Sequence, residues 1–163
     1  MDVTGLIRYT HASRRRYLKT LSELPWHEIV KDQGASFSSI RNIILHSLHF
    51  EDRLVNYVIP SKSEQLTQQD YEKYGDLHSI EKRVDEVEKK VNAYLVSLTQ
   101  SELDRKVTVP QRRGPAIIMR VEDILVNIAI ELISHMGELI AILWRIDKRP
   151  PFLSWSRFLE EST

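Results

Sequence analysis

Three side chains in the sequence are of the types that bind divalent metals: His46, Glu131 and His135. Glu131 and His135 are four positions apart, so they are neighbours on one face of a helix. At about 100° per residue, His135 falls near the centre of an apolar stripe and Glu131 about 40° from it. A carboxylate in an apolar seam is costly unless it is paired or binds a metal. The pattern predicts either a metal site or a His–Glu hydrogen bond with a buried water.

His46 is the natural third member of this set, because it lies at the border of the apolar stripe of another predicted helix. Glu51, on the apolar side of that helix, is a further inward candidate, whereas His49 is on the more polar side. The remaining histidines fall in no cluster that the sequence identifies: His11, His27 and His78.

Composition excludes several kinds of site. The 163 residues contain no cysteine, which rules out disulfides, thiolate nucleophiles and Cys-bound metals. There is no Gly-rich phosphate loop and no nucleophile elbow. Lys+Arg and Asp+Glu balance at 23 each, which argues against binding to nucleic acid or a membrane surface. The three arginines at 14–16 could contact phosphate, but a solvated helix face is the favoured interpretation.

The location expected from the sequence is the cytoplasm. The first residues lack a basic start followed by an apolar run, so they do not resemble a signal peptide. We find no apolar stretch of the ~20 residues that a membrane-spanning helix needs.

Four helices with apolar residues at helical spacing must position the candidate site. We expect them at residues 3–24, from after Gly34 to an end marked by Pro60, at 79–98 and at 120–145, with Ser36, Ser38 or Ser39 capping the second. The last helix is apolar on two sides, which indicates a central position or a contact with a second protomer. Its outward residues would form the interface of a homodimer: Ile130, Ile133 and Ile140.

The connections are long at 60–78 and 99–119, which favours crossovers over short loops. The second connection has the pattern of a short β-ribbon, with 106–109 and 116–119 flanking a Gly-Pro turn. Residues 147–163 form a tail that we expect to fold onto the bundle, since Phe152, Leu153, Trp155 and Phe158 are apolar. The sequence therefore predicts an all-α fold, a four-helix bundle with long crossover connections in a single domain, 1–163.

Two segments resemble the DinB-like family of metal-binding four-helix bundles. Residues 39–46 are similar to the entry of the family's second helix, which ends in its first histidine ligand. Residues 131–139 resemble the family's His-x-x-x-His-x-Gly-Gln segment, with Glu131 where histidine is usual and Glu138 where glutamine is usual. The resemblance implies that His46, Glu131 and His135 hold the metal. Two histidines and one carboxylate are a known set for catalytic zinc and for non-haem iron.

The resemblance also implies a function, a metal-dependent thiol S-transferase or isomerase. Its cofactors would be zinc, nickel, iron or manganese and a low-molecular-weight thiol, acting on a small-molecule substrate. Tyr57 or Glu138 would orient that substrate, and Arg112 or Arg113 would bind a carboxylate of the substrate or the thiol. The alternatives are a non-catalytic stress-response module with a structural site, and an interaction protein that functions as a homodimer.

Overall fold

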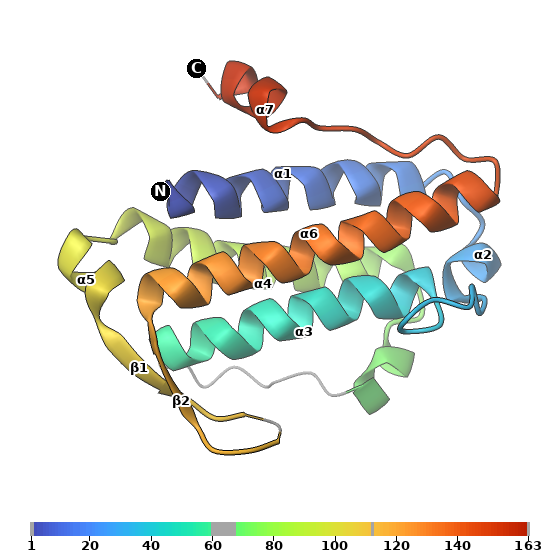
Figure 1. Ribbon diagram of the computed structural model, residues 1–163. Helices are drawn as coiled ribbons and strands as arrows, with labels where there is room; N and C mark the ends of the chain where they lie inside the picture. Colours follow the sequence, from blue (N-terminus) through green and yellow to red (C-terminus); the bar gives the residue numbers. More distant parts are fainter. Residues whose placement is uncertain (1, 60–67, 112, 163) are drawn as a thin grey trace.

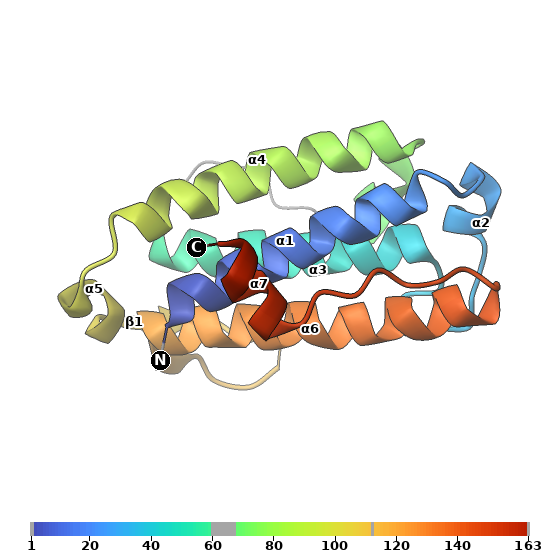
Figure 2. The ribbon, with the colours of Figure 1, turned by 90° about the horizontal axis from the view of Figure 1, so that it is seen from above.

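Four long helices form a bundle in the computed structural model, which describes residues 2–59, 68–111 and 113–162 (Figure 1). They are α1 (Val3–Leu21), α3 (Ile40–Val58), α4 (Leu77–Val96) and α6 (Val121–Arg145). Helix α6 packs against both α1 and α3. Helix α4 packs against α1 and α3 on the side away from α6 (Figure 2). The all-α four-helix bundle predicted from the sequence is confirmed.

Shorter elements connect and flank the long helices. Helical turns occur at α2 (Trp26–Val30), η1 (Gln68–Lys73), α5 (Gln100–Asp104) and α7 (Trp155–Glu161). Strands β1 (Lys106–Val109) and β2 (Ile117–Arg120) pair antiparallel, with Lys106 opposite Arg120 and Val109 opposite Ile117. This ribbon leads directly into α6 (Figure 1). The β-ribbon expected in the second long connection is therefore present.

Side-chain caps set where the helices begin. The hydroxyl of Ser39 accepts a hydrogen bond from the backbone N–H of Asn42 at 3.2 Å, so Ser39 is the cap among the three serines considered. Asp76 caps α4 by accepting from the backbone N–H of Ser79 at 2.7 Å. Helix α4 consequently begins at Leu77, two residues before the predicted start.

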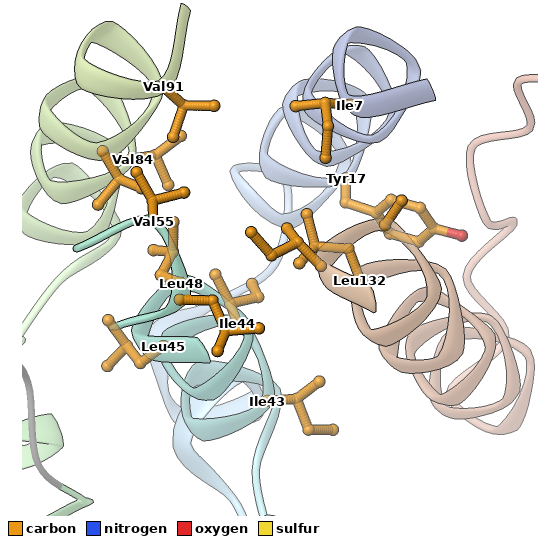
Figure 3. Close-up of a cluster of buried hydrophobic side chains, with 14 of the residues drawn as sticks. Ile7, Tyr17, Ile43, Ile44, Leu45, Leu48, Val55, Val84, Val91 and Leu132 are labelled. Carbon is orange, nitrogen blue, oxygen red and sulfur yellow. The ribbon is translucent and has the colours of Figure 1, made fainter. Parts of the chain in front are cut away.

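The apolar core lies between the long helices and fixes their spacing. Side chains from α1, α3, α4 and α6 converge there (Figure 3). Among them Ile7, Ile43, Leu48 and Val84 are completely shielded from solvent. Each fully buried side chain of this size contributes roughly 1.5–3 kcal/mol through burial. The α3–α6 contact that carries the candidate site is thus held by the core.

Helix α6 has a large exposed apolar surface. Ile130 is 56% exposed and Trp144 is 60% exposed. By length and composition alone, this 25-residue helix would be long and apolar enough to cross a membrane, a test that the core helix of a bundle also passes. In the structure it packs within the bundle against α1 and α3, and it carries Glu131 and His135.

The C-terminal tail runs back along α1 and α6 (Figure 2). The Tyr9 hydroxyl donates a hydrogen bond to the carbonyl of Leu153 at 2.9 Å, and its ring contacts Trp155 and Phe158 edge-on. Leu153 is buried, whereas Phe152 is 75% and Trp155 38% exposed, so the tail folds onto the bundle without burying all four of its apolar side chains.

Candidate metal centre

His46 on α3 meets Glu131 and His135 on α6 across the contact between the two helices. The Nε2 atom of His46 lies 3.3 Å from Oε1 of Glu131, and Nε2 of His135 lies 3.1 Å from the same oxygen. One ligand atom from each of the three residues lies within 4.8 Å of the other two. The structure therefore brings together the three residues that the sequence analysis selected.

The donor atoms fit a divalent ion. Ligand atoms about 2.1 Å from a tetrahedral zinc ion are separated by about 3.4 Å, close to the two nitrogen–oxygen distances within the trio. The same distances also suit hydrogen bonds between the carboxylate and two imidazoles, which is the metal-free alternative. Two nitrogens and one oxygen form a mixed set that zinc, nickel, iron and manganese all accept.

A further carboxylate orients His135. Oε2 of Glu138 lies 3.1 Å from Nδ1 of His135, and the Ser36 hydroxyl donates a hydrogen bond to the same oxygen at 2.8 Å. A metal-bound histidine usually donates its second ring N–H to a carboxylate, which sets the tautomer and raises the basicity of the ligating nitrogen. Glu138 therefore leaves Nε2 of His135 to face Glu131 and His46.

Phe37 forms a wall of the site that the sequence analysis did not identify. Its ring stacks on the imidazole of His46 at a centroid distance of 3.7 Å and contacts His135 edge-on at 5.4 Å. The loop before α3 turns tightly, with positive φ at Gly34 and at Ser38, and this turn places Phe37 over the histidines. Phe37 restricts the rotation of His46 and covers one side of the trio.

The trio is partly buried and remains open to solvent. The side chains of His135, His46 and Glu131 are 11%, 22% and 30% exposed, respectively. Burial lowers the pKa of His46 below its ordinary value, although the hydrogen bond to Glu131 acts in the opposite direction. The neutral imidazole, which is the form that binds metal, is thereby favoured at neutral pH.

Of the other site residues predicted from the sequence, only Glu138 is connected to the trio among the residues that the structure describes. Glu138 reaches the trio through His135. Tyr57 lies eleven residues beyond His46 on α3, about 16 Å along the helix axis, so it lies too far from the trio to contact an ion there. Arg113 is exposed in the turn of the ribbon, and Arg112 is outside the described residues.

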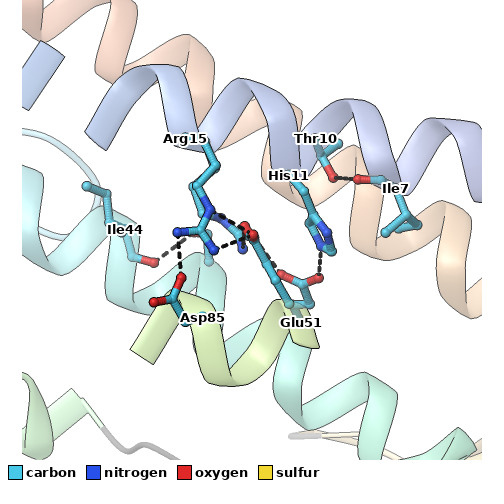
Figure 4. A network of polar contacts seen from close by, with 10 residues as sticks. Ile7, Thr10, His11, Arg15, Ile44, Glu51 and Asp85 are labelled. Carbon is cyan, nitrogen blue, oxygen red and sulfur yellow. Dashed lines mark hydrogen bonds and ion pairs between the residues drawn. The ribbon is translucent and has the colours of Figure 1, made fainter. Parts of the chain in front are cut away.

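Glu51 belongs to a separate buried cluster. Its Oε1 lies 2.6 Å from Nε2 of His11 (Figure 4). Its Oε2 accepts a hydrogen bond from Arg14 at 2.5 Å. Arg14 also donates to Glu88 on α4 at 3.1 Å. Burial by itself would raise the pKa of Glu51, but the charges and hydrogen bonds of Arg14 and His11 lower it to about 2. This cluster ties α1, α3 and α4 together.

This cluster corrects three interpretations made from the sequence. Glu51 is not a member of the metal trio, and His11 does belong to a cluster. The arginine run is not a solvated face, because Arg14 is only 4% exposed. Its neighbours are paired too, Arg15 with Asp85 and Glu88 and Arg16 with Glu161, so the run offers no free phosphate site.

A protein-family model described as the DinB superfamily matches residues 9–139 of the chain. This span includes the metal trio and Glu138. A search of curated proteins finds no match.

Proposed function

Because the chain belongs to the DinB superfamily, whose family model covers residues 9–139, we propose that His46, Glu131 and His135 bind one divalent metal ion. The observation that carries this proposal is the grouping of their three ligand atoms within 4.8 Å, beside a carboxylate that orients His135. Mutual hydrogen bonding within the trio is the metal-free alternative, and the metal content of the purified chain separates the two.

The ion would be held by three protein ligands, which leaves a coordination position open. Open sites are typical of catalytic metals, whereas structural zinc sites are closed by four protein ligands. The partial exposure of Glu131 and His46 gives a small molecule access to that position. We therefore favour a catalytic role over a purely structural one.

The reaction we propose is a metal-dependent transfer or isomerisation that uses a low-molecular-weight thiol. A bound divalent ion lowers the pKa of a coordinated thiol or water toward neutrality. The protein residues would contribute position: Glu138 holds His135, and Phe37 holds His46. Glu131, in place of a neutral imidazole, would favour a harder ion, such as manganese or iron, more than three histidines do.

Metal content and thiol transfer, measured together, test this proposal. The purified chain, prepared without a His-tag or chelator, should contain metal and should transfer a thiol to an electrophilic substrate. His46→Ala should lose both. If the wild-type protein contains metal but shows no thiol transfer, and chelation lowers only its melting temperature, the alternative of a structural site in a non-catalytic module is supported.

A homodimer is a second proposal, based on the outward face of α6. Ile130, Ile133, Ile140 and Trp144 are between 37% and 60% exposed. Exposed apolar side chains in this number along one helix are typical of a protein interface. We also propose a cytoplasmic location, with which a sequence without cysteine is compatible.

A further inference from the structure

A groove of about 410 Å³ lies between α3, the β-ribbon and α6. It lies close to the metal trio, because Phe50 is one helical turn beyond His46 and Asn127 is one turn before Glu131. Apolar side chains from all three elements line most of it, including Leu54, Val109 and Met119. The groove therefore extends the candidate site toward the ribbon.

Arg53 is the distinctive charged residue of this groove. Its guanidinium carbon lies 5.5 Å from the centre of the Phe50 ring. Among the described residues, no carboxylate lies within ion-pair distance of Arg53, although the side chain is half-buried. The acidic group that lines the groove, Asp123, is held by two hydrogen bonds from Arg120, at 2.9 and 3.1 Å. The unneutralised charge in the groove is thus positive.

Arg53 lies on the same side of α3 as His46. The two are seven residues apart, which is almost two full turns and about 10 Å along the helix axis. A guanidinium has five N–H donors and forms its strongest hydrogen bonds with carboxylates and phosphates. A half-buried guanidinium without an acidic partner is therefore suited to an anionic group of a ligand.

We propose that this groove binds substrates or thiols with an apolar body and a terminal carboxylate. The carboxylate binds Arg53, the body lies against Phe50 and the ribbon, and the opposite end reaches the trio. This inference rests on the proposed function for the role of the trio. It assigns to Arg53 the carboxylate-binding role that the sequence analysis gave to Arg112 or Arg113.

Binding to the metal-free protein tests the groove separately from the metal site. Octanoate and 1-octanol, which share an apolar chain, are titrated into the chelator-treated protein and followed by NMR. Octanoate should bind about tenfold more tightly than 1-octanol, as expected for one hydrogen-bonded charge pair. Arg53→Gln should abolish this preference, Arg53→Lys should retain part of it, and Arg8→Gln, which changes an exposed arginine of α1, should leave it unchanged.

A second measurement uses the cobalt-loaded wild-type protein and needs no mutation. The thiolate–cobalt absorption is followed while 8-mercaptooctanoate, 8-mercapto-1-octanol or 3-mercaptopropionate is added. 8-Mercaptooctanoate can span the distance to Arg53 and should bind at least about tenfold more tightly than 8-mercapto-1-octanol. 3-Mercaptopropionate is too short to reach Arg53, so its carboxylate should add no affinity.

The two measurements separate the two proposals. Equal affinity for octanoate and 1-octanol, or an unchanged preference in Arg53→Gln, overturns the role of Arg53 even if the protein binds metal. Failure to bind cobalt overturns the metal site, while an Arg53-dependent preference for octanoate still supports the anion-binding groove.

Discussion

Glu138 and Glu131 contact opposite nitrogens of the same imidazole, that of His135. Oε2 of Glu138 is 3.1 Å from Nδ1, and Oε1 of Glu131 is 3.1 Å from Nε2. With an ion bound at Nε2, the first contact would hold the proton of the imidazole on Nδ1. Glu138 is therefore a positioning residue, and its contribution can be measured separately from that of the ligands.

Glu138→Ala should weaken metal binding about 10- to 100-fold, the usual effect of losing a group that orients a metal ligand. Glu138→Gln should retain most of the affinity, because its amide oxygen can still accept the Nδ1–H hydrogen bond. Competition with a metal-binding dye measures both variants. Glu160→Gln, which changes an exposed carboxylate on α7, is the matched control. Wild-type affinity in Glu138→Ala would rule out the positioning role.

Glu131→His tests what the carboxylate contributes at the position where it contacts both histidines. Three imidazoles should prefer zinc or nickel over manganese more strongly than two imidazoles and a carboxylate do. We expect the ratio of zinc to manganese affinity to rise at least about tenfold in the variant. An unchanged ratio, with the variant folded by circular dichroism, would mean that Glu131 does not ligate the ion.

The long helices could be predicted from the sequence because their buried residues recur at helical spacing over several turns. The start of α4 was misplaced, since the apolar stripe begins at Ile80 while the cap is Asp76. Short helices such as α2 and α5 were not predicted, because five residues are too few to show a period. The ribbon was predictable from two apolar segments around a Gly-Pro turn.

The trio could be selected from the sequence because the helical wheel places His135 and Glu131 inward on α6. The surrounding groups could not be selected, since Phe37 and Ser36 come from a loop whose path depends on a positive φ at Ser38. The partners of Arg14 were also not predictable, because Glu51 and Glu88 are 37 and 74 residues away in sequence. Contacts between distant helices leave no local pattern.

The Glu51 cluster should make stability depend on pH. The pKa of Glu51 is about 2 in the folded protein, below its ordinary value of 4.5. Its ionised form therefore stabilises the fold above about pH 4.5, and this contribution is lost as the pH falls toward 2. The contribution is on the order of 3 kcal/mol, and denaturant unfolding at a series of pH values measures it.

Glu51→Gln isolates this contribution from those of other carboxylates. The variant should be destabilised by about 3 kcal/mol at pH 7, because Arg14 loses a buried anionic partner. The difference from wild type should shrink as the pH decreases from about 5 to about 2. A difference that stays constant over this range would show that the ion pair does not carry the stabilisation.

The proposed homodimer can be tested by changing the outward face of α6. Wild type should have a solution mass near twice that of the 19.1 kDa chain. The double variant Ile133→Lys/Trp144→Lys should be monomeric, because two charges in an apolar interface cost several kcal/mol. Val96→Lys changes an apolar residue that is 78% exposed on α4 and should leave the dimer intact. A monomeric wild-type mass, by light scattering, would exclude the dimer.

The central claim is that His46, Glu131 and His135 form a metal site, and the metal content of the purified chain tests it most directly. Protein without a His-tag is incubated with each candidate ion, dialysed without chelator and examined by elemental analysis, beside His46→Ala and His135→Ala. We expect about one ion per wild-type chain and almost none in either variant that remains folded. Equal, low metal content in wild type and His46→Ala would contradict it.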